Sequence, residues 1–256
     1  MQTWRFIQDG PVDGAWNMAV DRAVVAARSA DQVPPTLRVY RWRVPTVTLG
    51  RFQSEDDVDL AYCRRRGFDV VRRPTGGRGV LHDDEVTYSV AASLDDGMPR
   101  GVSASYRVLC GALAAAYQLL GVPADLTGRA RGEEGAGACY LHATHADLCL
   151  GAAKLSGSAQ LWDHGAVLQH GSFVRTRDAD AEARVFRLGE GGGRRLRAQT
   201  ATLEAAPGGA PEAEAIVSAI VRAFEESLGM TLVPGRLTPA ETDTAASLVD
   251  GFRTLA

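Results

Sequence analysis

The sequence predicts an α+β fold in which a mixed β-sheet is flanked by helices, and three observations indicate it. Short apolar segments rich in β-branched residues come in groups separated by turn residues, as in β-hairpins. Longer segments with apolar residues three or four positions apart, the spacing of an amphipathic helix, lie between these groups. The chain has 256 residues, which is near the upper limit for one hydrophobic core, so we expect a single domain over 1–256.

Helices are predicted at four places along the chain. The first two have helical apolar spacing over 14–30 and 103–121. Of the last two, one ends at Gly229, and the other begins with a capping box of Thr238 and Glu241. We expect these last two to form a C-terminal helical segment, 211–256, that packs on a core of about residues 1–200.

Strands are expected where short apolar segments are bounded by proline, glycine or acidic residues, and a hairpin turn is expected at 163–165. Two glycine-rich segments, 128–137 and 188–198, are predicted to be flexible, and 206–214 reads as a linker. The expected strands are 36–42, 46–50, 68–73, 77–82, 86–93, 154–162 and 166–174.

Composition excludes several classes of function. A net charge of −3 and a pI near 6.0 argue against nucleic-acid binding, which needs a basic surface. The N-terminal residues lack the pattern of a signal peptide, and no segment approaches the roughly 20 apolar residues that span a bilayer. Four cysteines in a chain of this length do not make a disulfide scaffold. We therefore expect a cytoplasmic protein with reduced thiols and with no nucleic-acid or membrane partner.

The segment 138–160, ACYLHATHADLCLGAAKLSGSAQ, holds two cysteines and two histidines close together. Thiolate and imidazole are zinc ligands, so Cys139, His142, His145 and Cys149 form a candidate metal site. Structural zinc sites, however, usually join two distant pairs of ligands, whereas these four lie within eleven residues. Buried, unreactive cysteines are the other interpretation, and it suits Cys149, which lies in an apolar run.

Cys139 differs because it follows a glycine-rich segment, where a thiol can remain exposed. A cysteine becomes a nucleophile when a nearby cation stabilises its thiolate. Lys154 is the only lysine among 28 basic residues, which suggests a role that arginine does not fill, because an ammonium group is a compact charge that can also lose its proton. Cys139 and Lys154 are therefore the candidate catalytic residues.

A glycine-containing turn supplies a second candidate site. The backbone amides of Gly76 and Gly77 can line a concave site for a carbonyl oxygen or an anion, with Arg73 or Arg78 as an additional donor. No Gly-Lys-Ser/Thr follows, so this is not a phosphate-binding P-loop. His82 is either a general base or a structural hydrogen-bonding group, and the sequence leaves both open.

Five motifs together resemble the biotin/lipoate protein ligase superfamily, which includes lipoate-protein ligase A/B. The resemblance covers residues 4–175, and it implies a fold like the catalytic domain of biotin ligases with a tunnel for a medium-chain acyl group. It also implies substrate-binding residues at Arg73, Thr75, Gly76, Gly77, Arg78, His82, Gly157, Ser158 and Ala159. The motifs are NMAVD, PTVTLGRFQ, RRPTGGRGVLHDDEVTYS, GAAKLSGSAQ and QHGSF.

Within the superfamily, the sequence is more similar to octanoyltransferases than to ligases that adenylate a free acid with ATP. The ligases usually resemble GGGAVFHD at the turn, where this chain has GGRGVLHD. The transferases carry ACF ahead of GSAQ, at the separation seen here from ACY, so Cys139 falls on their nucleophile and Lys154 on the family lysine. The chain departs from the family pattern in ATHADL, where PSWYEL is usual, and in Gly79, where alanine is usual.

The resemblance implies acyl transfer without a cofactor. Octanoyl would pass from acyl carrier protein to the Cys139 thiolate, and then to a lysine of a lipoyl domain in glycine cleavage H protein or 2-oxoacid dehydrogenase E2. The acidic carrier protein would suit the arginine-rich segment between Arg64 and Arg73. Three alternatives stay open, namely an ATP-dependent lipoate ligase, an amidotransferase between lipoyl domains, and a non-catalytic zinc-binding module.

Overall fold

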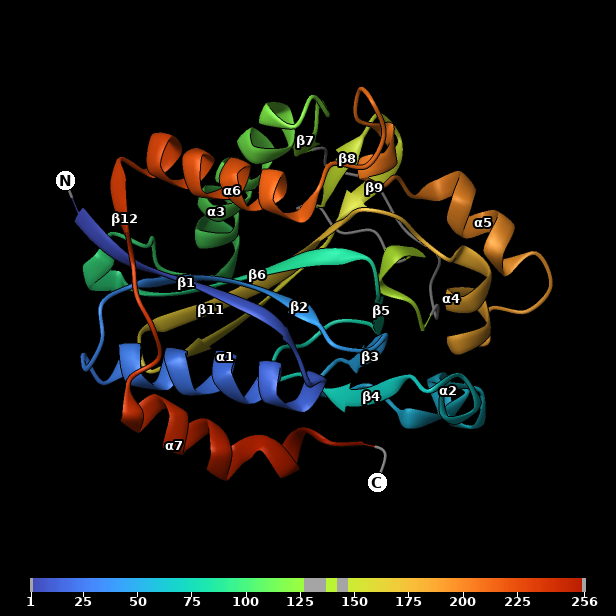
Figure 1. The fold of residues 1–256 in the computed structure, drawn as a ribbon, viewed down its shortest axis with the longest axis horizontal. Coiled ribbons are helices and arrows are strands. Elements are labelled where there is room, and N and C mark those ends of the chain that lie inside the picture. Colours follow the sequence, from blue (N-terminus) through green and yellow to red (C-terminus); the bar gives the residue numbers. More distant parts are fainter. Residues whose placement is uncertain (1, 127–136, 142–146, 255–256) are drawn as a thin grey trace.

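A six-stranded mixed sheet forms the centre of the computed structural model, which describes residues 2–126, 137–141 and 147–254 (Figure 1). The strand order is β10-β11-β6-β2-β1-β12. Strand β1 is parallel to β2 and β12, whereas the remaining pairs are antiparallel, so the predicted mixed sheet is confirmed. The strands are β1 (Gln2–Val12), β2 (Thr36–Trp42), β6 (Glu85–Ser93), β10 (Ser158–Asp163), β11 (Ala166–Val174) and β12 (Met230–Pro234).

Helices cover both faces of this sheet, as Figure 1 shows. On one face α1 (Gly14–Ser29) packs against α7 (Pro239–Leu248) and against the strands β6 and β11. On the other face α3 (Val102–Leu119) packs against α6 (Ala213–Leu228) over the largest apolar cluster. None of the described helices is long and apolar enough to cross a bilayer.

Two three-stranded sheets are also found in the described part of the chain, and both border the site discussed below. One has the order β4-β3-β5, and the other has the order β7-β8-β9. The short helices α2, α4 and α5 lie near them (Figure 1). The elements are β3 (Thr46–Leu49), α2 (Leu60–Arg66), β4 (Asp69–Arg72), β5 (Val80–His82), β7 (Asp125–Leu126), β8 (Leu148–Leu150), β9 (Ala153–Ser156), α4 (Ala179–Val185) and α5 (Gly192–Gln199).

Two sequence predictions of local structure were wrong, each for an identifiable reason. The segment 188–198 was expected to be flexible, but most of it forms α5. Its glycines allow close packing instead, because a Cβ on Gly193 would lie 2.0 Å from Asp180 Oδ1 in α4. The segment 154–162 was expected to be one strand, but it divides into β9 and β10 at Gly157.

The C-terminal segment 211–256 is not only helical, because it also supplies the edge strand β12 of the central sheet. The sequence analysis likewise missed β1, which contains Gly10 and Pro11 near its end, and the short helices α2 and α4. Of the predicted flexible segment 128–137, all but the last residue lies outside the described residues. The single-domain organisation stays a prediction.

A buried ion pair connects the first strand to the last helix. Arg5 donates to both carboxylate oxygens of Glu241, at 2.8 and 2.6 Å, and both side chains are buried. Glu241 also closes the predicted capping box with Thr238 at the start of α7. The same carboxylate therefore caps α7 and ties it to β1.

We expect Glu241→Ala to lower the free energy of unfolding by about 3–5 kcal/mol, because the change leaves the Arg5 guanidinium buried without its partner. Urea denaturation would measure this. The matched control is Glu226→Ala, which removes an exposed ion pair with Arg222 and should cost about 0.5 kcal/mol or less. Equal losses for the two variants would contradict the prediction.

Candidate active site

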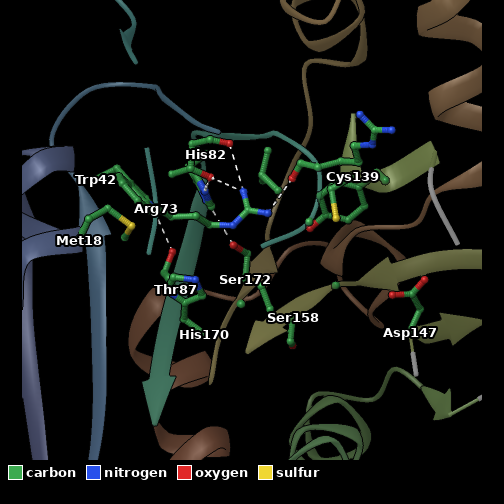
Figure 2. A pocket seen from close by; sticks show the side chains of 18 of the residues that line it. Met18, Trp42, Arg73, His82, Thr87, Cys139, Asp147, Ser158, His170 and Ser172 are labelled. Carbon is green, nitrogen blue, oxygen red and sulfur yellow. Dashed lines mark hydrogen bonds between the residues drawn. The ribbon is translucent and has the colours of Figure 1, made fainter. Parts of the chain in front are cut away.

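A pocket opens where the central sheet, the β4-β3-β5 sheet and the segment around Cys139 meet. Its space is about 710 Å³, with the open mouth included. Figure 2 shows Met18 and Trp42 toward one end of the view and Cys139 and Asp147 toward the other, with Arg73 between them. Seven of the predicted site residues line it besides Cys139 and Lys154: Arg73, Gly77, Arg78, His82, Gly157, Ser158 and Ala159.

The backbone of the glycine turn holds Cys139 at the pocket. The Cys139 amide donates to the carbonyl oxygen of Gly79 at 2.7 Å, and the Gly79 amide donates to the carbonyl oxygen of Gly137 at 3.0 Å. A Cβ on Gly79 would lie 2.3 Å from the ring of Phe186, so the ring fills the space that the usual alanine would need. The departure at Gly79 is thus matched by Phe186. The glycine turn and the segment around Cys139, which the sequence analysis treated as separate candidate sites, therefore lie side by side.

Lys154 is buried next to the Cys139 thiol. Its Nζ lies 3.8 Å from Cys139 Sγ, and it donates to the Cys139 carbonyl oxygen at 3.0 Å. It also pairs with Asp147 Oδ2 at 3.1 Å, and both charged side chains are almost fully buried. A buried ammonium needs a compensating carboxylate, so Asp147 keeps a cation beside the thiol. The structure thus brings together the two residues predicted to be catalytic.

Because Gly157 has no side chain, Lys154 and the Cys139 thiol can lie close to its backbone. A Cβ there would lie 3.1 Å from Lys154 Cε, 3.3 Å from Lys154 Nζ and 3.5 Å from Cys139 Sγ. The two distances to Lys154 are tight, whereas the one to Sγ is an ordinary contact, so a larger residue here would push the ammonium aside. The break between β9 and β10 falls at this glycine, and it lets the backbone pass close to both groups.

Arg73 is buried in the pocket wall and holds the glycine turn in shape. Its guanidinium donates to the carbonyl oxygens of Gly76 and Arg78, to Thr48 and to the Thr75 hydroxyl. Burial lowers its pKa, and the neighbouring Cys139 acts in the opposite direction. The charge of Arg73 therefore faces the region of the thiol while its hydrogen-bonding groups serve the turn.

Thr75 and Gly76 lie behind the pocket wall and do not line the pocket. The Thr75 hydroxyl hydrogen-bonds to His170 Nε2 at 2.7 Å and accepts a hydrogen bond from Arg73. The Gly76 carbonyl oxygen accepts another from Arg73. Both residues shape the wall through these partners, and their contact with substrate stays a prediction.

His82 lines the pocket between two partners. Its Nε2 lies 2.9 Å from Thr48 Oγ1, its Nδ1 lies 2.7 Å from Glu85 Oε1, and its ring stacks on Trp42 at 4.2 Å. Burial raises the pKa of Glu85, but the charge and hydrogen bond of His82 outweigh it and hold that pKa below its usual range. Because both ring nitrogens are engaged, the structural interpretation of His82 is favoured.

The floor of the pocket rests on a buried polar network centred on Asp21 of α1. Its carboxylate accepts hydrogen bonds from Arg38 at 2.8 Å, Tyr40 at 2.9 Å and Ser89 at 2.8 Å, and lies 3.0 Å from His170 Nδ1. Burial raises the pKa of Asp21, but His170 and Arg38 lower it below its usual range. Burial also lowers the pKa of His170.

The sequence analysis missed Asp21 and Asp147 as part of the site. A signal for Asp21 was available, because it is an acidic residue on the apolar face of a helix within the motif NMAVD. Asp147 directly precedes an apolar strand but has no periodic pattern that would indicate burial. Only the fold pairs it with Lys154.

Two members of the candidate metal site, His142 and His145, lie outside the described residues. Within the described ranges, no group of three or more possible ligands lies together. Cys149 is fully buried in β8, where its thiol faces the carbonyl oxygen of Asp147 at 3.9 Å. Cys139 is the partly exposed cysteine, whereas Cys63, Cys110 and Cys149 are buried.

We expect iodoacetamide at mildly alkaline pH to label Cys139 well before the other three cysteines. Burial raises the pKa of Cys63 to about 11 and that of Cys110 to about 12, so both thiols stay protonated there. Peptide mapping by mass spectrometry would measure the order, and denatured protein, in which all four should react, is the control. Equally fast labelling of Cys63 or Cys110 in the folded protein would contradict the prediction.

Comparison with known proteins finds relatives over most of the chain. The lipoyl protein ligase A/B catalytic domain family matches residues 13–225. Octanoyltransferase LipM of Kyrpidia tusciae is 41% identical over 97% of this chain and 96% of its own length, and that of Moorella thermoacetica is 42% identical over 94% and 92%.

Solved structures show the same fold. Lipoate-protein ligase A bound with ATP superimposes with a TM-score of 0.82 at 25% identity, covering 98% of this chain and 95% of that one. The bipartite lipoate protein ligase of Thermoplasma acidophilum gives 0.80 at 24% identity, covering 98% and 93%. The match over most of the sequence, together with relatives above 40% identity, shows that this chain belongs to the lipoyl protein ligase A/B catalytic domain family.

Proposed function

We propose that this protein is an octanoyltransferase of lipoate assembly that moves octanoyl from acyl carrier protein, through a thioester on Cys139, to a lysine of a lipoyl domain. The observation that supports it most is the Cys139 thiol 3.8 Å from the buried Lys154 ammonium at a mostly apolar pocket. The relatives named Octanoyltransferase LipM support the same chemistry. The acceptor is glycine cleavage H protein or 2-oxoacid dehydrogenase E2, and the reaction takes place in the cytoplasm.

In the first half-reaction, the Cys139 thiolate attacks the carbonyl carbon of the octanoyl thioester. A new carbon–sulfur bond forms, the bond to the carrier sulfur breaks, and the carrier leaves as a thiolate that takes up a proton. Lys154 stabilises the attacking thiolate by its charge. The apolar side chains of Met18 and Trp42 line the pocket where the octanoyl chain would lie.

In the second half-reaction, the neutral amine of an acceptor lysine attacks the Cys139 thioester. The carbon–nitrogen bond forms, the bond to Cys139 Sγ breaks, and the amine loses one proton. Lys154 and Asp147, 3.1 Å apart, are placed to relay that proton as an acid–base pair. The amides of Gly77 and Gly157, which line the pocket, are the candidates to stabilise the developing oxyanion.

No ATP is required, because a thioester already carries the activation that an adenylate would supply, and the conversion of a thioester to an amide is downhill. The shared fold with an ATP-bound ligase keeps ligation as the alternative activity. The two differ in what they need: the ligase would use a free acid with ATP, and Cys139 would be dispensable for it.

We expect intact mass spectrometry to show an octanoyl adduct after the protein is mixed with octanoyl-acyl carrier protein without ATP. The adduct should be removed by hydroxylamine and absent in Cys139→Ala, because Cys139 is the partly exposed cysteine that lines the pocket, whereas the other three are buried. Turnover that appears only with free acid and ATP, and that survives Cys139→Ala, would exclude the transferase in favour of the ligase. Transfer of octanoyl between lipoyl domains without carrier protein would indicate the amidotransferase.

We expect Lys154→Met to abolish adduct formation and to lower the free energy of unfolding by about 3 kcal/mol, because the change breaks the buried ion pair with Asp147. The double variant Lys154→Met/Asp147→Asn should recover most of the stability and none of the adduct. Urea denaturation and the mass assay together separate the two roles of Lys154. A double variant that regains the adduct would show that Lys154 acts only in folding.

A further inference from the structure

A basic surface stands out on this acidic protein. The segments 60–66 and 179–199 carry eight arginines and three acidic residues, whereas the chain has 28 basic and 31 acidic residues. One of those three acids, Glu182, is buried against Arg177. The excess of positive charge thus lies on α2, α4, α5 and the turn between the last two.

These helices form one continuous surface. The Asp59 amide at the start of α2 donates to the Val185 carbonyl oxygen of α4 at 2.8 Å. Tyr62 joins two arginines, because Arg66 donates to its hydroxyl at 2.8 Å and the Arg184 guanidinium lies 6.0 Å from its ring centre. Helix α5 in turn packs against α4.

Four of the five arginines of α4, α5 and their connecting turn line one open groove beside the glycines at 189 and 191–193. Three acidic residues, Asp59, Asp180 and Glu190, line the same groove and compensate part of this charge. Arg197 pairs with Asp180 at 3.0 Å, and Arg184 lies 3.8 Å from Asp59. In the described ranges Arg187 and Arg194 make no ion pair, and both are exposed. We define the arginine face as Arg66, Arg184, Arg187, Arg194 and Arg197.

The arginine face borders the reactive cysteine. Helix α5 contacts the short helix Cys139–Leu141 and the strand β9 that carries Lys154. At the end of α4, the Phe186 ring packs on Gly79, whose carbonyl oxygen accepts from the Cys139 amide. A protein bound on this face would therefore lie next to Cys139.

We infer that the arginine face is the docking surface for the acidic carrier protein that presents the acyl thioester. The inference rests on the proposed function. Charge complementarity favours the donor over the acceptor, because the donor thioester is carried on an arm with an anionic phosphodiester, whereas the acceptor approaches with a lysine that is cationic until it loses a proton. Arginine suits both the carboxylates and the phosphodiester, because it binds each with two donors.

This surface differs from the segment Arg64–Arg73 expected from the sequence. Arg73 is buried in the pocket wall, and Arg72 donates to the carbonyl oxygens of Gly50 and Gln53. Neither contributes to the face. Arg66 is the residue that the face shares with that segment. Arg194 and Arg197 come from 188–198, which the sequence suggested was flexible, and Arg184 and Arg187 precede it.

The test is the double variant Arg187→Glu/Arg194→Glu, which reverses two groove-lining arginines that make no ion pair within the described part of the chain. We expect the rate of Cys139 acylation by octanoyl-acyl carrier protein, followed by mass spectrometry, to fall about tenfold or more and to depend less on salt. Acylation by octanoyl-pantetheine, a small donor without protein or phosphate, should be unchanged. Transfer from preformed acyl-enzyme to a lipoyl domain should also be unchanged.

The control is Arg107→Glu/Arg222→Glu, which makes the same change in net charge on exposed positions of α3 and α6 and should leave all three rates unchanged. An equal loss with octanoyl-pantetheine would mean that the variant damages the site, and no loss with the carrier protein would mean that docking is elsewhere. Either result would overturn the inference. If the unsubstituted protein forms no adduct with either donor, the proposed function fails instead.

Discussion

The buried ion pair between Lys154 and Asp147 is the interaction on which the candidate site depends. Placing an ammonium group in the protein interior costs several kcal/mol unless a carboxylate and other acceptors surround it. Here the carboxylate lies 3.1 Å away, and the Cys139 carbonyl oxygen accepts at 3.0 Å. That second contact ties the ammonium to the same residue whose thiol it approaches. The arrangement that makes the charge tolerable therefore also fixes the distance between Nζ and Sγ.

Glycines meet the second constraint, which is that three backbone segments must lie within a few ångströms of each other or of the thiol. A Cβ on Gly50 would lie 1.9 Å from the Gly77 carbonyl oxygen, so the loop after β3 can meet the glycine turn only without a side chain. Gly77 also has a φ of +95°, which other residues rarely adopt. With Gly157 beside the thiol, these positions show that the glycines of the motifs mainly permit close approach.

The sequence was sufficient to predict features that depend on local residue patterns or on the resemblance of motifs. Helical spacing gave α1 and α3, the capping box at Thr238 gave the start of α7, and the motifs placed Cys139 and Lys154 together. The sequence alone could not identify which side chains interact when the fold brings together residues from different elements. Asp147 and Asp21 form ion pairs with residues on other elements, Lys154 of β9 and Arg38 of β2. The glycines at the start of α5 indicate flexibility in the sequence, whereas in the fold Gly193 leaves room for the Asp180 carboxylate.

Arg73 shows how the pocket holds a charge and still suits an acyl chain. Its guanidinium nitrogens donate to Thr48, Thr75 and the carbonyl oxygens of the glycine turn. Because those donors are used within the wall, the guanidinium adds positive potential near the thiol without presenting a bare polar group to an apolar ligand. The glycine turn is also hydrogen-bonded to the Cys139 backbone, because the Gly79 carbonyl oxygen accepts from the Cys139 amide. One buried arginine therefore orders the wall and, through the glycine turn, helps to position Cys139.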